Sequence, residues 1–225
     1  MPLIELSGVN KTYRSNGNVV AALQEIDLQI EEGEFVALMG PSGSGKSTLL
    51  SILGAMNPPS SGLVRIDGIA VYDLPLELRA DLRHAYLGFV FQQLQLIPYL
   101  TAMENVQLPL AITRLPLGGR ADLARQALAR VGLADKERRL PGQLSGGEQE
   151  RVAVARAIAN GPPILLADEP TGNLDTATGR QVMELFRGLN RDGLTIVMVT
   201  HNPDSAALAG RIVHIRDGRL EGSSR

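Results

Sequence analysis

The sequence contains no cysteine, and this absence excludes several kinds of chemistry. Disulfide bonds, thiolate zinc sites and cysteine nucleophiles are all impossible, and the composition fits the cytosol. Long hydrophobic runs are also absent, since none approaches the ~20 residues that span a bilayer. The first residues show no basic stretch followed by an apolar run, so we expect no signal peptide. If the protein acts at a membrane, we expect another chain to supply the membrane part.

An excess of positive charge is lacking as well. The chain has 22 Lys and Arg against 24 Asp and Glu, which gives a formal net charge of −2. This balance disfavours a basic nucleic-acid-binding surface and a strong attraction to anionic lipid. With 225 residues, of which 44% are hydrophobic and 20% charged, the composition is that of a globular protein with a substantial core.

Three short apolar runs without polar interruption predict buried strands. Each run ends in a polar cluster and is followed by a helix-like pattern, which is the order expected of a parallel sheet with helical crossovers. In such sheets, ligands bind at the carboxyl ends of the strands. The runs are residues 35–39, 164–167 and 195–199.

The two ends of the chain and its middle have different patterns. Strand-like runs joined by glycine-containing turns, together with a C-terminal hairpin, predict an antiparallel β layer beside the main sheet. Residues 94–160 lack strand-like runs, and residues 120–131 have the spacing of an amphipathic helix, so we predict a helical insertion there. The strand-like runs are residues 3–6, 27–30, 63–66 and, for the hairpin, 211–221.

A glycine-rich segment follows the first of the buried strands and precedes a predicted helix at residues 47–56, as the P-loop pattern requires. Its glycines let backbone N–H groups turn toward a polyphosphate, and the helix N-terminus adds partial positive charge. Lys46 would reach the outer phosphates, and the hydroxyl of Ser47 would bind Mg²⁺. A simple Gly/Ser-rich turn is the alternative. The segment comprises Gly40, Pro41, Ser42, Gly43, Ser44, Gly45, Lys46, Ser47 and Thr48.

Two carboxylates follow the second buried strand at its ligand-binding end. Asp168 would hold Mg²⁺, directly or through water. Glu169 would face the γ-phosphate and accept a proton from the attacking water. An acidic pair after a strand is often only a helix cap or a solvated turn, but the P-loop upstream favours the catalytic interpretation.

A helix is predicted to begin after Ser145, because Ser145 and Glu148 have the spacing of a capping box. Gly146 and Gly147 at its start are unfavourable for helix propensity, which indicates that a partner approaches the backbone there. A γ-phosphate at the helix N-terminus would be such a partner. A capped helix without a ligand is the alternative.

With these motifs in place, the sequence resembles the ATP-binding cassette (ABC) family. The segment from Gly40 to Thr48 resembles the Walker A motif of the family, and residues 144–149 resemble its signature motif. The matches run in family order from residue 13 to residue 201. The further matches are Tyr13 for the aromatic residue that stacks on adenine, Gln92 for the Q-loop glutamine, Asp175 for the D-loop aspartate and His201 for the switch histidine.

The resemblance implies an α/β fold. It consists of a P-loop NTPase core with a mainly parallel sheet, an antiparallel β subdomain and an inserted α-helical subdomain, all in a single domain of residues 1–225. We assign residues 1–92 and 161–225 to the core with its β layer. Residues 93–160 form the helical subdomain with the signature motif.

Some of the matched residues have other possible roles. His201 at a strand end could be structural, and Tyr13 could serve in packing. Asp175 could cap the helix that begins near residue 176, and Gln93 is the neighbouring alternative to Gln92. The resemblance implies instead that His201 contacts the γ-phosphate and orients Glu169 or water, and that Gln92 is a catalytic residue and a ligand of Mg²⁺.

In this family two cassettes pair head to tail, so the resemblance implies a homodimer that encloses ATP. The P-loop of one chain would face the signature helix of the other, whose Ser145, Gly146 and Gly147 would serve the partner's nucleotide. ATP would hold the pair together and hydrolysis would loosen it, which could drive the movement of a partner. Glu148 and Glu150 depart from the glutamines common in the family, and we expect Glu148 to weaken ATP affinity.

Residues 96–106 and residues 171–175 are similar to cassettes of the lipoprotein-release, macrolide-export and cell-division branch. Cassettes of this branch power separate permeases, so we expect residues 96–103, from Leu96 to Met103, to border the groove for a permease segment, with ordinary packing as the alternative. The chain would then lie peripherally on the cytoplasmic side of the inner membrane, with no nucleic acid bound. A soluble ABC ATPase of DNA repair, chromosome organisation or translation and a non-catalytic regulatory module are the competing functions.

Overall fold

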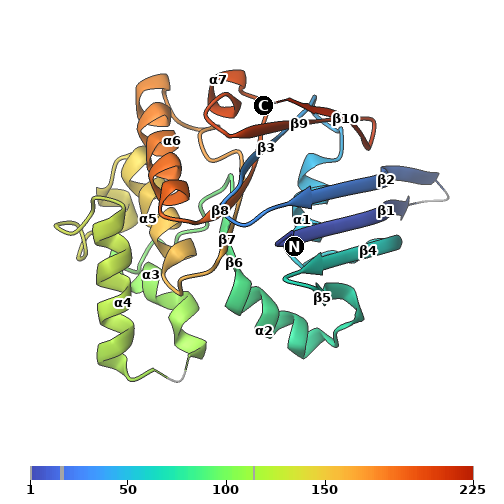
Figure 1. Cartoon of the computed structure of the whole chain (residues 1–225). Coiled ribbons are helices and arrows are strands. Elements are labelled where there is room, and N and C mark those ends of the chain that lie inside the picture. The colour runs from blue at the N-terminus through green and yellow to red at the C-terminus, as the bar shows by residue number, and fades with distance from the viewer. Residues whose placement is uncertain (1, 16–17, 114, 225) are drawn as a thin grey trace.

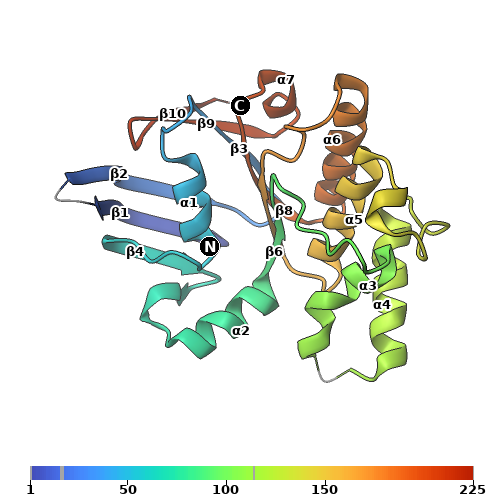
Figure 2. The same cartoon turned by 180° about the vertical axis from the view of Figure 1, so that it is seen from behind.

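In a computed structural model of the chain, residues 2–15, 18–113 and 115–224 are described. Two β-sheets lie side by side, and a group of helices covers the far face of the larger sheet (Figure 1). The same three layers are visible from behind in Figure 2. The α/β class predicted from the sequence is confirmed.

The larger sheet has six strands in the order β10-β9-β3-β8-β7-β6. Five of these strands run parallel, namely β9, β3, β8, β7 and β6, and β10 pairs antiparallel with β9 at one edge. The three apolar runs predicted as buried strands form β3, β7 and β8, which confirms that prediction. The strands are β3 (Phe35–Met39), β6 (Leu87–Val90), β7 (Ile164–Asp168), β8 (Thr195–Thr200), β9 (Arg211–Arg216) and β10 (Arg219–Ser224).

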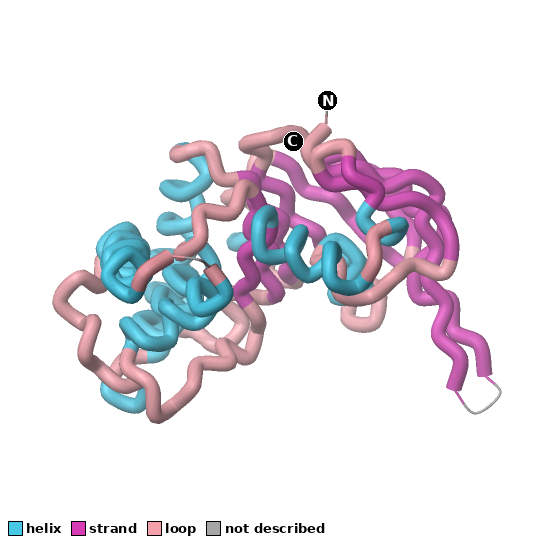
Figure 3. Tube along the Cα trace, turned by 90° about the horizontal axis from the view of Figure 1, so that it is seen from below, coloured by secondary structure: helices cyan, strands magenta, loops and turns pink. Residues whose placement is uncertain are grey.

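The smaller sheet is antiparallel and has four strands in the order β2-β1-β4-β5. It contains the three N-terminal runs predicted from the sequence, and β1 and β2 are much longer than those runs. Figure 3 shows how far the outer ends of β1 and β2 extend beyond the rest of the molecule. The strands are β1 (Ile4–Ser15), β2 (Asn18–Ile30), β4 (Ser61–Ile66) and β5 (Ile69–Ala70).

The C-terminal hairpin formed by β9 and β10 corrects one expectation. The sequence grouped it with the antiparallel layer, but it extends the larger sheet, because β9 pairs with β3 from Val36↔Arg211 to Met39↔His214. The apolar side chains of Val213 and Ile215 are buried in the core between the two sheets, which fixes this placement. A hairpin signature predicts the local turn and pairing but not the sheet that the hairpin joins.

The uninterrupted apolar runs of the central strands are explained by two separate cores. Alternate residues of a strand face opposite sides, so Val36 and Leu38 pack between the sheets while Phe35 and Ala37 pack against the helices. Helix α1 (Lys46–Leu53) contributes Leu49 and other apolar residues to the core between the sheets. Both faces of the large sheet are therefore buried, and its carboxyl edge is left for the site.

The middle of the chain is helical, as predicted: no strand occurs in the described residues of 94–160. The helices of this part and those that follow share the core on the far face of the large sheet, some packing on its strands and others on neighbouring helices. The division of the chain into residues 1–92, 93–160 and 161–225 stays a prediction. The remaining helices are α2 (Leu76–Tyr86), α3 (Ala102–Gln107), α4 (Leu117–Arg130), α5 (Gly146–Ile158), α6 (Thr176–Arg191) and α7 (Pro203–Ala206), with 3₁₀ turns at Val71–Asp73, Leu108–Ile112 and Pro141–Gln143.

Candidate active site

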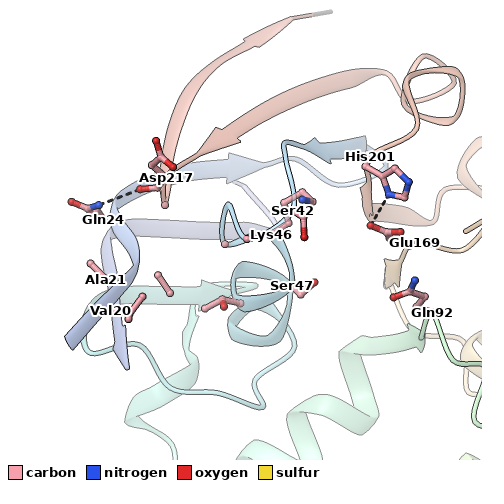
Figure 4. Close-up of a pocket in the computed structure, with 15 residues that line it drawn as sticks. Val20, Ala21, Gln24, Ser42, Lys46, Ser47, Gln92, Glu169, His201 and Asp217 are labelled. Atoms are coloured by element: carbon pink, nitrogen blue, oxygen red, sulfur yellow. Dashed lines mark hydrogen bonds and ion pairs between the residues drawn. The ribbon is translucent and has the colours of Figure 1, made fainter. Parts of the chain in front are cut away.

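A cleft of ≈ 890 Å³ opens at the carboxyl edge of the large sheet, where the loops after β3, β7 and β8 meet (Figure 4). It brings together residues that the sequence marked in four separate motifs. Of these predicted residues, Ser42, Gly43, Gly45, Lys46, Ser47, Thr48, Gln92, Glu169 and His201 line the cleft.

The P-loop turns between β3 and α1 in conformations that require glycine. Gly43 has φ +80° and Gly45 has φ +103°, in the left-handed region that side chains rarely adopt. Gly40 is needed for a different reason, because a Cβ atom there would overlap the carbonyl oxygen of Ile215 in β9. The glycine pattern therefore reflects both the shape of the loop and its close contact with the C-terminal hairpin.

The ammonium group of Lys46 is held inside the P-loop. Its Nζ donates hydrogen bonds to the carbonyl oxygens of Gly40 and Pro41, each at 2.8 Å, and the residue is buried. Because a buried ammonium needs compensating oxygen atoms, these carbonyls fix its position beside the backbone N–H groups at the start of α1. The loop thus presents concentrated positive charge to the cleft, as an anionic ligand requires.

Asp168 and Ser47 come from different elements and meet beside Lys46. The Oγ atom of Ser47 lies 3.4 Å from Oδ1 of Asp168, at the end of β7. Burial raises the pKa of Asp168 above its ordinary value, and the negative charge of Glu169 adds to this effect. The hydrogen bond from Ser47 and the charge of Lys46 act in the opposite direction. A nearby cation would stabilise the ionised form of this carboxylate further. A carboxylate oxygen beside a hydroxyl oxygen is also a pair of ligands that suits Mg²⁺.

Glu169 and His201 form a second pair across the cleft. Nδ1 of His201 lies 2.8 Å from Oε1 of Glu169, and Figure 4 shows the imidazole at the carboxylate. The backbone of Glu169 has φ 47°, and its N–H donates to the carbonyl of Val199 at 2.9 Å. This unusual conformation is stabilised by the pairing with β8 and directs the carboxylate into the cleft. A carboxylate oriented by a histidine is the arrangement of a general base with its positioning partner.

Gln92 lies at the cleft, whereas its neighbour Gln93 does not line it. The carbonyl of Gln92 accepts a hydrogen bond from Nδ2 of Asn173 at 3.2 Å, which links the loop after β6 to the loop after β7. Farther along, Arg156 of α5 donates to the carbonyls of Leu94 and Gln95 at 2.6 and 2.7 Å. The register that favours Gln92 is therefore consistent with the geometry.

The predicted signature residues lie outside this cleft. Ser145 caps α5: its Oγ accepts from the N–H of Glu148 at 3.3 Å, and Oε2 of Glu148 accepts from the N–H of Ser145 at 2.8 Å. Ser145 and Gly146 are exposed, so the first turn of α5 faces the surface. Gly147 is buried, and a Cβ atom there would overlap Cγ2 of Thr178 in α6. Packing between two helices is thus a sufficient reason for one of the two glycines.

Asp175 caps α6 as the sequence suggested. Its Oδ1 accepts from the backbone N–H groups of Ala177 and Thr178, both at 3.0 Å, and Thr178 Oγ1 donates to Oδ2 at 2.5 Å. These hydrogen bonds lower the pKa of Asp175. The residue does not line the cleft, so a contact with a second chain stays a prediction.

Tyr13 lies on β1, directly opposite Val20 of β2, and Val20 lines the cleft. Tyr13 itself is half-exposed and is not among the lining residues. Its hydroxyl accepts a hydrogen bond from Nδ2 of Asn57 at 2.7 Å. The stacking role of Tyr13 stays a prediction.

One wall of the cleft was not predicted from the sequence. The residues of this wall have no charge pattern or motif that marks a site, apart from the Asp217-Gly218 pair, which indicated only a turn. The N–H of Gly218 donates to the carbonyl of Ser44 at 3.0 Å, and its carbonyl accepts from the N–H of Gln24 at 2.7 Å. The hairpin turn is thereby joined to both the P-loop and β2. The missed lining residues are Val20, Ala21, Ala22, Gln24, Asp217 and Gly218.

Glu148 and Glu150, two residues apart on α5, have opposite surroundings. The N–H of Ser145 lowers the pKa of Glu148, and Lys136 Nζ lies 3.7 Å from its Oε1. Glu150 is buried, its Oε1 has no hydrogen-bond partner among the described residues, and burial raises its pKa to about 8. The effect of Glu148 on ATP affinity stays a prediction.

Comparison with known proteins gives a consistent picture. A family model described as ABC transporter matches residues 23–172. The chain is 47% identical over 224 residues to the ABC transporter ATP-binding protein MJ0796 of Methanocaldococcus jannaschii, over 97% of this chain and 95% of that protein. It is 49% identical over 230 residues to the macrolide export ATP-binding/permease protein MacB of Syntrophobacter fumaroxidans, over 100% of this chain but only 32% of that protein.

Solved structures match to the same extent. A dimeric structure of the cassette MJ0796 in a post-hydrolysis state, bound to ADP and Pi, has a TM-score of 0.90 at 45% identity and covers 99% of this chain and 98% of that one. The cbiO1 protein of Clostridium perfringens, described as part of the cbiONQ ABC transporter complex, has a TM-score of 0.90 at 27% identity, over 99% of this chain and 88% of that chain.

Replacement of Glu150 by Gln is expected to stabilise the fold more at pH 8 than at pH 5. In the unfolded chain Glu150 ionises near the ordinary value of 4.5, but burial raises its pKa to about 8 in the fold. The folded state therefore binds the extra proton between these values, and the free energy of unfolding falls as the pH rises through this range. The gain from Glu150→Gln should grow by about 1–4 kcal/mol from pH 5 to pH 8, measured by urea denaturation.

Glu148→Gln is the matched control. Because the pKa of Glu148 is lowered, the side chain is mostly ionised in both the folded and the unfolded state from pH 5 to pH 8, and its effect on the free energy of unfolding should change little over that range. An equal pH trend in both variants would show that ionisation of Glu150 does not cause the pH dependence of the free energy of unfolding.

Proposed function

This chain belongs to the ABC transporter family as an ATP-hydrolysing subunit, and we propose on that premise that two copies close head to tail over two molecules of MgATP. The observation that carries the proposal is the separation of the signature residues from the cleft. Ser145 and Gly146 are exposed at the tip of α5 and are not among the residues that line the cleft of their own chain. The dimeric state of the similar cassette MJ0796 supports the same arrangement.

The cleft fits ATP with its phosphates at the P-loop and its base toward β1 and β2. Backbone N–H groups at the start of α1 and the ammonium of Lys46 surround the phosphate end. Gly40, Pro41 and Ser44 complete the P-loop, while Ser42, Thr48 and the two left-handed glycines line the cleft. At the other end, the predicted stacking residue Tyr13 lies opposite Val20.

Ser47 and Asp168 are the residues that would hold Mg²⁺, and Gln92, which lines the same cleft as Ser47, would be a further ligand. Within the described residues, no three His, Cys, Asp or Glu side chains gather as a metal site, so phosphate oxygens and water would supply the remaining ligands. This division of ligands is usual for Mg²⁺ in nucleotide sites. When bound, the ion neutralises charge on the β- and γ-phosphates.

Glu169 is the general base of the proposed hydrolysis. Its carboxylate takes a proton from a water molecule as the water oxygen bonds to the γ-phosphorus and the bond to the β-phosphate oxygen breaks. His201, 2.8 Å from that carboxylate, holds it in position and lies where it can contact the γ-phosphate. The incoming Ser145, Gly146 and Gly147 of a second copy would close the site and exclude water.

The loop that follows Glu169 connects this general base to Gln92 and to helix α6. Asn173 links the loop after β7 to Gln92, and Asp175 ends the same loop as the cap of α6. Thr178, which Asp175 binds, also packs against Gly147 at the start of α5. We propose that Asp175 keeps this loop in place at the interface between the two copies.

The docking surface for a permease is proposed at residues 96–103 and the adjoining helices. Tyr99 is 79% exposed, and its neighbour Leu100 lines a pocket together with Leu117, which is 81% exposed. The loop is rigid, because buried Asn105 bonds to Ile97, Leu100 and Thr101. An exposed apolar group on a fixed scaffold is typical of a protein-interaction site.

Two further observations agree with a separate membrane partner. In the described residues no helix has the length and hydrophobicity to cross a membrane. The MacB relatives, of which the chain spans about a third, are named for both an ATP-binding and a permease part. We propose that the chain lies on the cytoplasmic side of the inner membrane, held by such a permease. This function is favoured over that of a soluble ABC ATPase in DNA repair or translation.

Glu169→Gln is expected to abolish ATP turnover without abolishing ATP binding. The amide cannot accept the proton of the attacking water, but it preserves the size and polarity of the side chain. MgATP should then accumulate between two copies, and size-exclusion chromatography should show a dimer that the wild-type chain does not retain. Turnover equal to that of the wild type would refute the role of Glu169.

Mixing two inactive variants is expected to restore ATPase activity if the site is shared. Lys46→Ala removes the P-loop cation, and Gly146→Asp places a charge at the signature tip, so each variant alone has two defective sites. A mixed dimer has one site with both halves intact. Activity should reappear on mixing, up to about half of the wild-type value for each mixed dimer, since one of its two sites is whole. No recovery would place the complete site within one chain.

Tyr99→Asp is expected to detach the chain from its membrane partner while the ATPase activity of the isolated protein stays unchanged. A buried carboxylate at a docking surface is costly, and Tyr99 is remote from the cleft residues. Native membranes stripped of the endogenous cassette should retain the wild-type chain but not the variant in a sedimentation assay. Glu184→Ala, an exposed change on α6, serves as the control. Equal retention of Tyr99→Asp would remove residues 96–103 from the interface.

A further inference from the structure

A chain of hydrogen bonds joins the P-loop helix to the hydroxyl of Tyr13. Ser51 Oγ donates to the carbonyl of Thr48 at 2.8 Å, within α1. Nδ2 of Asn57 lies 3.3 Å from the same Ser51 Oγ and donates to Tyr13 Oη at 2.7 Å. One side-chain amide therefore connects the helix that begins at the P-loop with the aromatic residue of the antiparallel sheet.

Asn57 is itself fixed on its backbone side. Its N–H donates to the carbonyl of Ser51 at 3.2 Å, and its carbonyl accepts a hydrogen bond from the hydroxyl of Tyr72 at 3.0 Å. The same hydroxyl donates to the carbonyl of Ile52 at 2.7 Å. Because its backbone is bound to both α1 and Tyr72, Asn57 has little freedom to move relative to the P-loop.

The ring of Tyr13 is constrained from a second direction. Lys11 Nζ lies 5.1 Å from the centre of the ring, over one face, and donates to the carbonyl of Pro58 at 2.6 Å. A cation above an aromatic face is attracted to the electrons of the ring. Tyr13 is paired with Val20, and side chains directly opposite each other on antiparallel strands point to the same face of the sheet. Tyr13 is therefore presented on the side of the sheet to which the cleft residue Val20 belongs.

We propose that Asn57 is a positioning residue that sets the orientation of the Tyr13 ring relative to the P-loop, so that the adenine of ATP stacks on the ring while the loop holds the triphosphate. The proposal rests on the proposed function and on the predicted stacking role of Tyr13. Asn57 touches neither the base nor the phosphates. It acts by fixing the distance and angle between the two parts of the site that bind the two ends of one ligand.

A change at Asn57 should affect the binding of adenine but not the binding of the phosphates. Without the hydrogen bond from Asn57 to its hydroxyl, the Tyr13 ring samples more orientations. The ring must then be ordered when adenine binds, and this entropy cost lowers the affinity for ATP. The phosphate end is unaffected, because the P-loop and Lys46 make no hydrogen bond to Asn57. Inorganic tripolyphosphate has no adenine base, so its affinity should not change when Asn57 is substituted.

The experiment measures the KM and kcat of ATP hydrolysis and the inhibition constant of Mg-tripolyphosphate for the wild type, Asn57→Ala and Tyr13→Phe. We expect each variant to raise the KM for ATP by about 3- to 10-fold, the size of one lost hydrogen bond, with kcat unchanged. The inhibition constant of tripolyphosphate should stay the same. Asn57→Asp can accept a hydrogen bond from the Tyr13 hydroxyl and should restore most of the affinity.

The double variant decides whether the two residues act through one bond. If they do, Asn57→Ala combined with Tyr13→Phe raises the KM no more than either change alone. Tyr86→Phe is the matched control, because it removes another tyrosine hydroxyl bond, to Asp67 at 2.8 Å, away from the cleft. Additive effects, or equal weakening of tripolyphosphate, would overturn the proposal.

The proposed function and this inference fail in different ways. A wild-type chain that does not hydrolyse ATP refutes the function. A wild-type chain that does so with the same KM as Asn57→Ala and Tyr13→Phe refutes only the role of Asn57. Tyr13→Phe keeps the ring on a half-exposed strand position, so the test does not depend on whether Asn57→Ala folds normally.

Discussion

The register of three parallel strands decides where the functional side chains of this protein meet. Met39 of β3 pairs with Thr200 of β8, and Val199 of β8 pairs with Asp168 of β7, so the three strands end at the same edge. The P-loop, the acidic pair and His201 leave the sheet from these three ends. A shift of one residue in either pairing would turn Asp168 or Thr200 to the opposite face. The two cores on either side of the sheet prevent such a shift, because every second residue belongs to one of them.

The same edge explains why the chain needs a second copy. Residues after the ends of β3, β7 and β8 line the cleft, but no residue of α5 does. Helix α5 is held on the far face of the sheet by close contacts, since a Cβ atom on Gly88 of β6 would overlap the carbonyl of Ala157 and one on Gly147 would overlap Thr178. It cannot swing over the P-loop of its own chain without losing this packing. A neighbouring copy can bring its α5 tip to the nucleotide without any change in these contacts.

Much of this architecture could be predicted from the sequence. The uninterrupted runs in β3, β7 and β8 identified the buried parallel strands, and the P-loop and acidic pair identified the edge at which they end. The capping box of Ser145 and Glu148 identified the start of α5, and Asp175 the start of α6. These successes share a cause, because each depends on residues close together in the chain. The C-terminal hairpin was predicted as well, but its place beside β3 depends on Val213 and Ile215 packing between the sheets, which local pattern cannot show. For the same reason Gln24 and Gly218, nearly two hundred positions apart, were not recognised as one wall of the site.

The glycines show why a motif alone does not identify a role. The sequence attributed the paired glycines of the signature segment to close approach of a phosphate, yet Gly147 is required by Thr178 and only Gly146 is exposed. Gly218 is similar: it has φ +75° and no space for a Cβ atom beside the carbonyl of Ala22, while its N–H and carbonyl bond to the P-loop and to β2. Its turn therefore holds the P-loop at Ser44 and joins it to β2. The nucleotide site depends on such contacts between distant segments as much as on the residues that touch the ligand, because a triphosphate is bound well only by N–H groups already in place before it arrives.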